Sequence, residues 1–107
     1  MSGKPSRDKG SRGELEVCRL IRDALGVDVN RTPNSGGLWI PGDIQGLPDV
    51  HVEVKRQERW NLRDWMRQSE QDCPETKVPT VWFRSNREPW YVALWATDFL
   101  NLYKRLT

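Results

Sequence analysis

Apolar residues near the start of the chain recur at the spacing of an amphipathic helix. From Leu15 to Leu25 they are three or four positions apart, and a glycine follows, so one stripe of the helix would face a core. Ser11 and Glu14 have the spacing of a capping box, which is typical of a helix start. The pattern predicts a helix over residues 11–25.

The middle of the chain alternates short extended segments with turn residues. Residues 27–31, 38–40, 43–47 and 50–57 have strand character, and proline, glycine, asparagine and serine separate them. The last of these segments alternates valine with polar residues, as a half-buried strand does. Together the segments predict a β-meander.

The second half of the chain returns to helical spacing and then to strands. Residues 61–72 are helical in pattern and stop before a proline. Residues 78–84 and 90–95 are rich in strand-forming side chains, with a hairpin turn predicted at 85–87. A last helix would begin near Thr97. The order α-β-β-β-α-β-β-α predicts an α/β fold, with a mixed β-sheet flanked by helices.

Composition limits the size of the core. A chain of 107 residues suits one domain, but only 36% of them are hydrophobic and six are tryptophan, more large rings than so small a body can bury completely. The strand residues Trp82, Phe83, Trp90 and Tyr91 exceed what one face of a sheet can cover. We therefore expect either a second helix layer or a twofold dimer interface over them.

The ends and the cysteines suggest a simple organisation. Residues 1–10 are rich in glycine, serine, proline and lysine without apolar periodicity, which predicts a flexible basic arm before a single domain over residues 11–107. No apolar run reaches the about 18 residues of a membrane span. Cys18 and Cys73 lie far apart, and no leader is recognisable. We expect a soluble, cytoplasmic protein whose cysteines are small core residues.

Positive charge is clustered along the chain, although the net charge is only +2. Such clusters favour a polyanionic partner, while a merely solvated helix face is the alternative. The clustered residues are Lys4, Arg7, Lys9 and Arg12, then Lys55, Arg56, Arg59, Arg63 and Arg67.

The segment HVEVKR, residues 51–56, carries the candidate chemistry. Side chains alternate between the two faces of a strand, so Glu53 and Lys55 share a polar face that should line a cleft. Asp43 on the neighbouring strand would lie beside Glu53, because adjacent strands are about 4.8 Å apart. Two carboxylates at this distance favour a hard divalent cation with bound water between them. Lys55 would orient that water or stabilise charge on a phosphate.

Asp43 followed by Glu53-Val54-Lys55 resembles the D…ExK signature of the PD-(D/E)xK nuclease superfamily. The resemblance implies a restriction-endonuclease-like fold with an α-β-β-β-α-β core, here with an extra strand and a C-terminal helix. It also implies that Asp43, Glu53 and the Val54 carbonyl hold Mg²⁺, for which Mn²⁺ would substitute. Asp49, in the pair Pro48-Asp49, stays open as an alternative ligand.

A second group of residues is similar to one branch of that superfamily, the archaeal-type Holliday junction resolvases. It consists of Lys9-Gly10, Glu14 at a helix start, and the segment from Arg31 to Ser35. The resemblance spans about Lys9 to Gln68. It implies that Glu14 completes the metal shell, directly or through water, and that Ser35 belongs to the active site.

Other positions are assigned less directly. Gln68 has the place of a glutamine that related nucleases carry on the helix after the ExK strand, with Gln71 as its competitor. His51 reads as a structural residue rather than a third metal ligand, and Trp65 as a core residue. Trp60 could stack on exposed bases. The residues expected to contact DNA are Lys9, Arg12, Arg31, Ser35, Arg56, Arg59 and Arg63.

The sequence thus predicts a metal-dependent endonuclease for branched DNA, in particular a homodimeric Holliday junction resolvase, plausibly phage-encoded. The resemblance implies products with 5′-phosphate and 3′-hydroxyl ends. One alternative is another nuclease of the superfamily, of the virus-type replication-repair kind, acting on flaps, ends or duplex DNA. An alternative of another class is a non-catalytic DNA-binding module.

Overall fold

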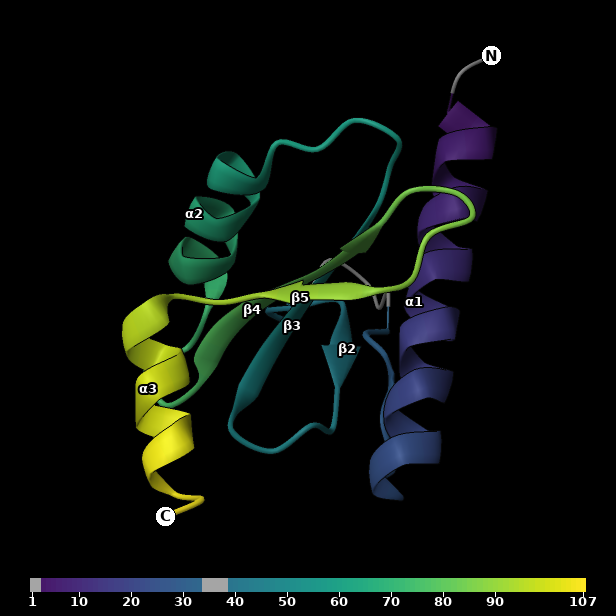
Figure 1. Cartoon of the computed structure of the whole chain (residues 1–107). Coiled ribbons are helices and arrows are strands. Elements are labelled where there is room, and N and C mark those ends of the chain that lie inside the picture. Colours follow the sequence, from purple (N-terminus) through teal and green to yellow (C-terminus); the bar gives the residue numbers. More distant parts are fainter. Residues whose placement is uncertain (1–2, 34–38) are drawn as a thin grey trace.

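The computed structural model describes residues 3–33 and 39–107, and from residue 9 onward also their side chains (Figure 1). Three helices and five strands follow one another in the order that the sequence predicts, which confirms the α-β-β-β-α-β-β-α arrangement. The elements are α1 (Gly3–Leu25), β1 (Asn30–Arg31), β2 (Ile44–Gln45), β3 (Val50–Arg56), α2 (Leu62–Asp72), β4 (Val78–Arg84), β5 (Tyr91–Ala93) and α3 (Ala96–Lys104).

The five strands form one mixed sheet in the order β1-β2-β3-β4-β5. The pairs β1–β2, β2–β3 and β4–β5 are antiparallel. The central pair β3–β4 is parallel, with Glu53 opposite Val81 and Lys55 opposite Phe83, because α2 carries the chain across between the two strands. A five-stranded mixed sheet flanked by helices is consistent with a restriction-endonuclease-like fold, so the predicted fold class is confirmed.

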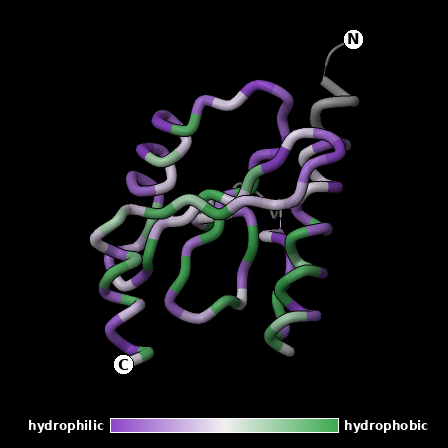
Figure 2. Tube along the Cα trace, viewed as in Figure 1, coloured by the Kyte–Doolittle hydropathy of each residue, from purple (hydrophilic) through white to green (hydrophobic). Residues whose placement is uncertain are grey.

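The helices α1 and α2 cover opposite faces of the sheet (Figure 1). On one face, Val17, Cys18 and Ile21 of α1 pack against Val52 and Val54 of β3. The expectation that these valines face a helix is therefore confirmed. Figure 2 shows hydrophobic and hydrophilic positions mixed along the central strands, and α2 as mainly hydrophilic with a narrow apolar stripe. That stripe buries Trp65 and Met66 against Val81 and Phe83 of β4.

The surplus of aromatic residues is divided between the two helix layers. Trp82 and Trp90 pack against the core beneath α1, while Phe83 lies in the core beneath α2. Of the two predicted explanations, helix layers on both faces of the sheet, rather than a dimer interface, thus account for these three rings. Tyr91 on the edge strand β5 remains exposed.

The first helix begins earlier than the sequence suggested. α1 starts at Gly3, so residues 3–10 are helical and the prediction of a flexible arm there is wrong. The capping box is wrong as well, because Ser11 and Glu14 lie inside the helix and contact Arg31 instead. A proline in the first helical turn is compatible with this earlier start, because no intrahelical bond from its nitrogen is needed there.

Other elements differ in length. The strand predicted over 38–40 is absent at Trp39 and Ile40, while Leu38 lies outside the described residues. β1 and β2 keep only two residues each of the predicted segments. Cys18 and Cys73 are free thiols, the first buried in the core and the second half-buried. Within residues 3–33 and 39–107, no helix is long and apolar enough to cross a membrane.

Gly46, in the turn after β2, gives a test of the local backbone. Its φ is +107°, and a Cβ there would lie 2.5 Å from the carbonyl oxygen of Asp28. We expect Gly46→Ala to lower the free energy of unfolding by roughly 2 kcal/mol or more, measured by urea denaturation. Gly10→Ala is the control, because that Cβ would meet nothing within 4 Å and alanine favours a helix. Equal effects of the two substitutions would contradict the turn geometry.

Candidate active site

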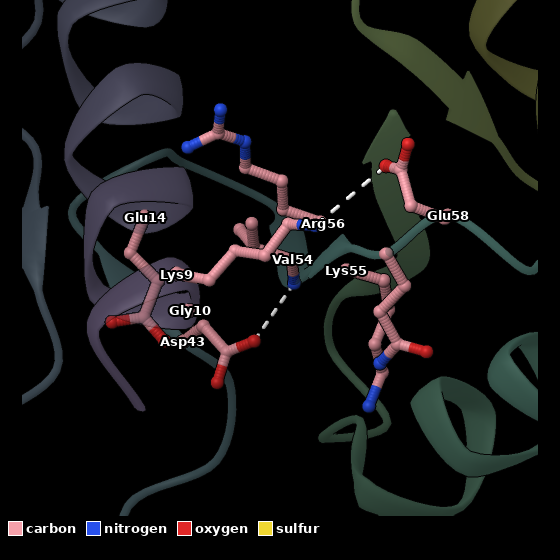
Figure 3. A pocket seen from close by; sticks show the side chains of 9 residues that line it. Lys9, Gly10, Glu14, Asp43, Val54, Lys55, Arg56 and Glu58 are labelled. Carbon is pink, nitrogen blue, oxygen red and sulfur yellow. Dashed lines mark hydrogen bonds and ion pairs between the residues drawn. The ribbon is translucent and has the colours of Figure 1, made fainter. Parts of the chain in front are cut away.

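A pocket of about 650 Å³ opens between the first half of α1 and the carboxyl end of β3 (Figure 3). It brings together six of the residues that the sequence singled out, from segments far apart along the chain. The lining residues are Lys9, Gly10, Glu14, Asp43, Val54, Lys55, Arg56, Gln57 and Glu58.

Gly13 determines how closely α1 approaches β3 beside this pocket. It is buried, and a Cβ at this position would lie 3.1 Å from Cβ of Arg56 and 3.5 Å from Cγ1 of Val54. The helix backbone therefore rests almost directly on the strand. This approach carries Glu14, the next residue, to the pocket wall.

Asp43 takes a place in the sheet next to β3. Its backbone N–H donates to the Val52 carbonyl at 2.8 Å, and its carboxylate Oδ2 accepts from the Val54 N–H at 2.7 Å. The side chain thus occupies the position where a neighbouring strand would otherwise offer a carbonyl. Gly42, with φ of +86°, turns the chain immediately before it.

The Asp43 and Glu53 carboxyl groups are close enough to affect each other strongly. Burial raises the pKa of Asp43 from 3.8 to about 7, with the neighbouring Glu53 carboxylate as the next cause and Glu14 as a smaller one. The Val54 N–H acts in the opposite direction. At neutral pH the Asp43 carboxyl group is therefore only partly ionised, and a cation placed between it and Glu53 would remove the cost of ionising it.

His51 contacts Glu53 on the same strand face. Its Nε2 lies 3.0 Å from Glu53 Oε1, and both side chains are buried. An ionised carboxylate can only accept, so the imidazole N–H donates. Gly42 leaves room for the ring, because a Cβ there would lie 3.3 Å from two of its atoms. Sequence reasoning treated His51 as structural; its place two residues before Glu53 was the available signal for this contact.

Two ion pairs border the pocket. Arg31 Nε donates to Glu14 Oε1 at 2.8 Å, and Lys9 Nζ lies 3.6 Å from Glu58 Oε2 across the opening (Figure 3). Arg31 thus neutralises the carboxylate that was expected near the metal. A role for Arg31 or Lys9 in binding DNA stays a prediction.

The two basic residues after Glu53 have different surroundings. Lys55 lines the pocket and has no ion-pair partner among the described residues. Arg56 is held by Glu16 at 3.1 Å, and the same carboxylate also binds Arg84 and the indole N–H of Trp90. The charge of Arg56 is therefore partly compensated within the protein, because Glu16 is shared with Arg84.

The remaining predicted residues lie elsewhere or outside the described chain. Gln68 and Gln71 are exposed on α2, and neither lines the pocket. Arg12 lines a separate shallow groove on α1. Ser35 lies outside the described residues. Asp49 is exposed in the turn before β3, away from the pocket lining, so the placement favours Asp43 as the candidate ligand. Arg59, Arg63 and Arg67 are also exposed.

The donor set suits a hard divalent cation with an incomplete protein shell. Within the described residues, no three His, Cys, Asp or Glu side chains converge as a ready-made metal cluster. Two adjoining carboxyl groups are present, and Glu14 lies farther out beside Arg31. Oxygen donors and a partly open shell are what Mg²⁺ accepts, because it keeps several waters and binds substrate phosphates directly.

Known proteins support the same interpretation. Residues 5–107 match the model of the family described as "Phage putative PDDEXK endonuclease". Protein D14 of Escherichia phage T5 is 28% identical over 116 aligned residues, which cover 87% of this chain and 72% of that protein. No solved structure matches the chain significantly. The family match extends over nearly the whole chain, and the chain therefore belongs to this phage PD-(D/E)xK endonuclease family.

Proposed function

We propose that the protein hydrolyses phosphodiester bonds of DNA at this pocket with Mg²⁺, and that it acts on branched DNA such as the four-way junction. The observation that carries the chemistry is the adjoining pair Asp43 and Glu53: burial raises the pKa of Asp43 to about 7, with the Glu53 carboxylate as the next cause. Two adjoining carboxyl groups withdrawn from solvent cost stability, and such pairs are typical of functional sites. In a nuclease, it would bind the catalytic cation.

The proposal assigns roles to six residues at or beside the pocket. Asp43, Glu53 and the Val54 carbonyl would hold the cation, and Glu14 would reach it through water. The bound ion would supply an activated water and neutralise charge on the phosphate. Lys55, whose ammonium has no partner among the described residues, would orient the attacking water or stabilise the developing negative charge. Lys9 would bind a neighbouring backbone phosphate after release from Glu58.

His51 is proposed as the residue that orients Glu53. His51→Phe keeps a planar ring but removes the N–H that lies 3.0 Å from Glu53 Oε1. Losing such a partner weakens metal binding by about 10- to 100-fold, so we expect Ca²⁺ affinity, measured by calorimetry without DNA, to fall by about tenfold. His51→Gln, which keeps a donor, should restore part of it. Unchanged Ca²⁺ affinity in a folded His51→Phe protein would contradict this role.

The preference for branched DNA rests on the similarity of Lys9-Gly10, Glu14 and Arg31 to junction resolvases. In support, all three side chains lie at or beside the pocket. A substrate panel tests the preference, with a four-way junction, a flap and a linear duplex of the same sequence, each incubated with Mg²⁺ or EDTA. We expect the junction to be cut fastest and EDTA to stop all cleavage. Equal rates on junction and duplex would favour the replication-repair alternative, and cleavage in EDTA would exclude the metal site.

We also propose that the protein is a homodimer that acts in the cytoplasm of the infected host cell. Helix α3 has no buried residue, and Phe99, Leu100, Tyr103 and Leu106 are all exposed. An apolar helix face of this kind is typical of an interface between copies. Sedimentation of the protein and of a Leu100→Lys variant would test it, with a monomeric variant as the expected result.

A further inference from the structure

Four aromatic side chains gather next to the active-site pocket, and two of them are open to solvent. Trp60 stands edge-on to Phe83 and Tyr91, with ring centroids 4.9 and 5.3 Å away. Phe83 also stacks with Tyr91 and contacts Trp65. Phe83 and Trp65 are buried, whereas Trp60 is 43% and Tyr91 41% exposed. The buried rings thus support the two exposed ones.

Trp60 is fixed in place, which separates it from an ordinary exposed tryptophan. Besides the two edge contacts, its indole N–H donates to the Gln57 carbonyl at 3.2 Å. Gln57 and the next residue, Glu58, line the pocket that holds Asp43. The ring therefore lies on the same short segment as the pocket wall, only three positions farther along the chain.

Two arginines flank Trp60 along the chain. Arg59 precedes Trp60, and Arg63 is on the first turn of α2; both are exposed, and neither forms an ion pair within the described residues. An exposed ring with unpaired arginines close by in the chain has the chemistry that binds single-stranded nucleic acid. Bases stack on the ring while cations hold the adjoining phosphates.

We propose that Trp60, with Tyr91 beside it, is a stacking site for an unpaired nucleobase of the substrate. This inference rests on the proposed action on DNA, and it gives the preference for branched DNA a physical basis. Bases at a branch point can leave the helix stack at a lower cost than bases within a duplex. A base held at Trp60 would place the neighbouring phosphates at the pocket mouth, where Lys9 and Lys55 lie.

The experiment compares two DNA ligands in EDTA, so that binding is read without cleavage. One is a duplex with a single unpaired 2-aminopurine, and the other is the same duplex fully paired. Wild-type protein is expected to quench the fluorescence of the unpaired 2-aminopurine and to bind this ligand more tightly than the paired one. Trp60→Ala should abolish the quenching and weaken binding of the unpaired ligand by about tenfold, with less than a twofold effect on the paired duplex.

Two further variants make the result specific. Trp60→Phe keeps a ring on the buried aromatic residues and should retain most of the quenching. Trp39→Ala removes an exposed tryptophan outside the cluster and should leave the ratio of the two affinities unchanged. Thermal unfolding checks that each variant is folded. The proposal would be overturned if Trp60→Ala lost affinity equally for both ligands, or if the folded Trp60→Ala protein still quenched the fluorescence. It would also be overturned if Trp60→Ala converted a dimer to a monomer.

A failure of this site is distinguishable from a failure of the proposed function. The binding assay needs no metal and no cleavage, whereas the nuclease activity is read from Mg²⁺-dependent products. If the Trp60→Ala protein cuts DNA at the normal rate and still quenches the fluorescence, only the stacking site is refuted. If the wild-type protein quenches the fluorescence but cuts no DNA, only the proposed nuclease activity is refuted.

Discussion

Replacing Asp43 with asparagine is expected to lower Mg²⁺-dependent DNA cleavage by about a thousandfold or more. The substitution keeps an oxygen that can accept from the Val54 N–H, now 2.7 Å from Asp43 Oδ2, so the sheet should stay intact. It removes the negative charge that would hold the cation, and with it the electrostatic stabilisation of the transition state. Single-turnover cleavage of a labelled four-way junction measures the loss.

The matched control is Asp49→Asn, the same chemical change at the other aspartate that the sequence left open. Asp49 is exposed and has φ of 64°, a conformation that asparagine adopts readily. We expect its cleavage rate to stay within about twofold of wild type, a margin typical of a surface change. Junction binding in EDTA should persist in both variants. A slow Asp49→Asn protein beside an active Asp43→Asn protein would reassign the metal ligand.

The stability of the metal-free protein is expected to fall as pH rises from about 4 to about 7. In the folded state the pKa of Asp43 is raised from 3.8 to about 7 by burial and by Glu53. The folded protein then binds more protons than the unfolded chain over this interval, so the free energy of unfolding decreases with pH. The difference corresponds to on the order of 4 kcal/mol above pH 7. Urea denaturation at a series of pH values in EDTA measures it.

Two comparisons identify the source of this dependence. Asp43→Asn removes the titrating group, so its stability should exceed that of wild type at pH 8 and change less between pH 4 and 7. A divalent cation at pH 8 should stabilise wild type, because it binds the ionised pair of the folded state, and should stabilise Asp43→Asn much less. A wild-type stability that rises from pH 4 to 7 would contradict the raised pKa of Asp43 in the folded state.

Element order was predictable because each element carries its own local signal. Alternating valines over 50–57 and the helical stripe of 61–72 led to β3 and α2 with small boundary errors. The beginning of α1 was not predictable in this way. Residues 3–10 have no apolar stripe, and their glycine, serine and proline content favours an irregular segment. The two-residue strands β1 and β2 are likewise set by pairing with their neighbours, β1 with β2 and β2 with β3, and not by their own sequence.

The candidate site shows the same division between local and long-range information. Spacing along one strand pointed to Val54 and Lys55, which both line the pocket. The motif alone did not decide between Asp43 and Asp49, whereas in the structure Asp43 lines the pocket and Asp49 does not. The pairing of Glu16 with Arg56 and Arg84 joins positions far apart in the chain, so nothing in the sequence indicated that Arg56 has an acidic partner within the protein. Gln68 was assigned by its place on a helix, but α2 buries Trp65, Met66 and Ser69 and leaves that side chain outside.

The contact between α1 and β3 at Gly13 has a consequence for how a substrate must enter. Because the helix backbone lies against β3 at Gly13, in contact with the side chains of Val54, Arg56 and Trp90, both walls of the pocket belong to one tightly packed unit. We expect the protein to hold its shape while the nucleic acid bends to bring a phosphate into reach. DNA that is already flexible or kinked would then need the least free energy of deformation to bind.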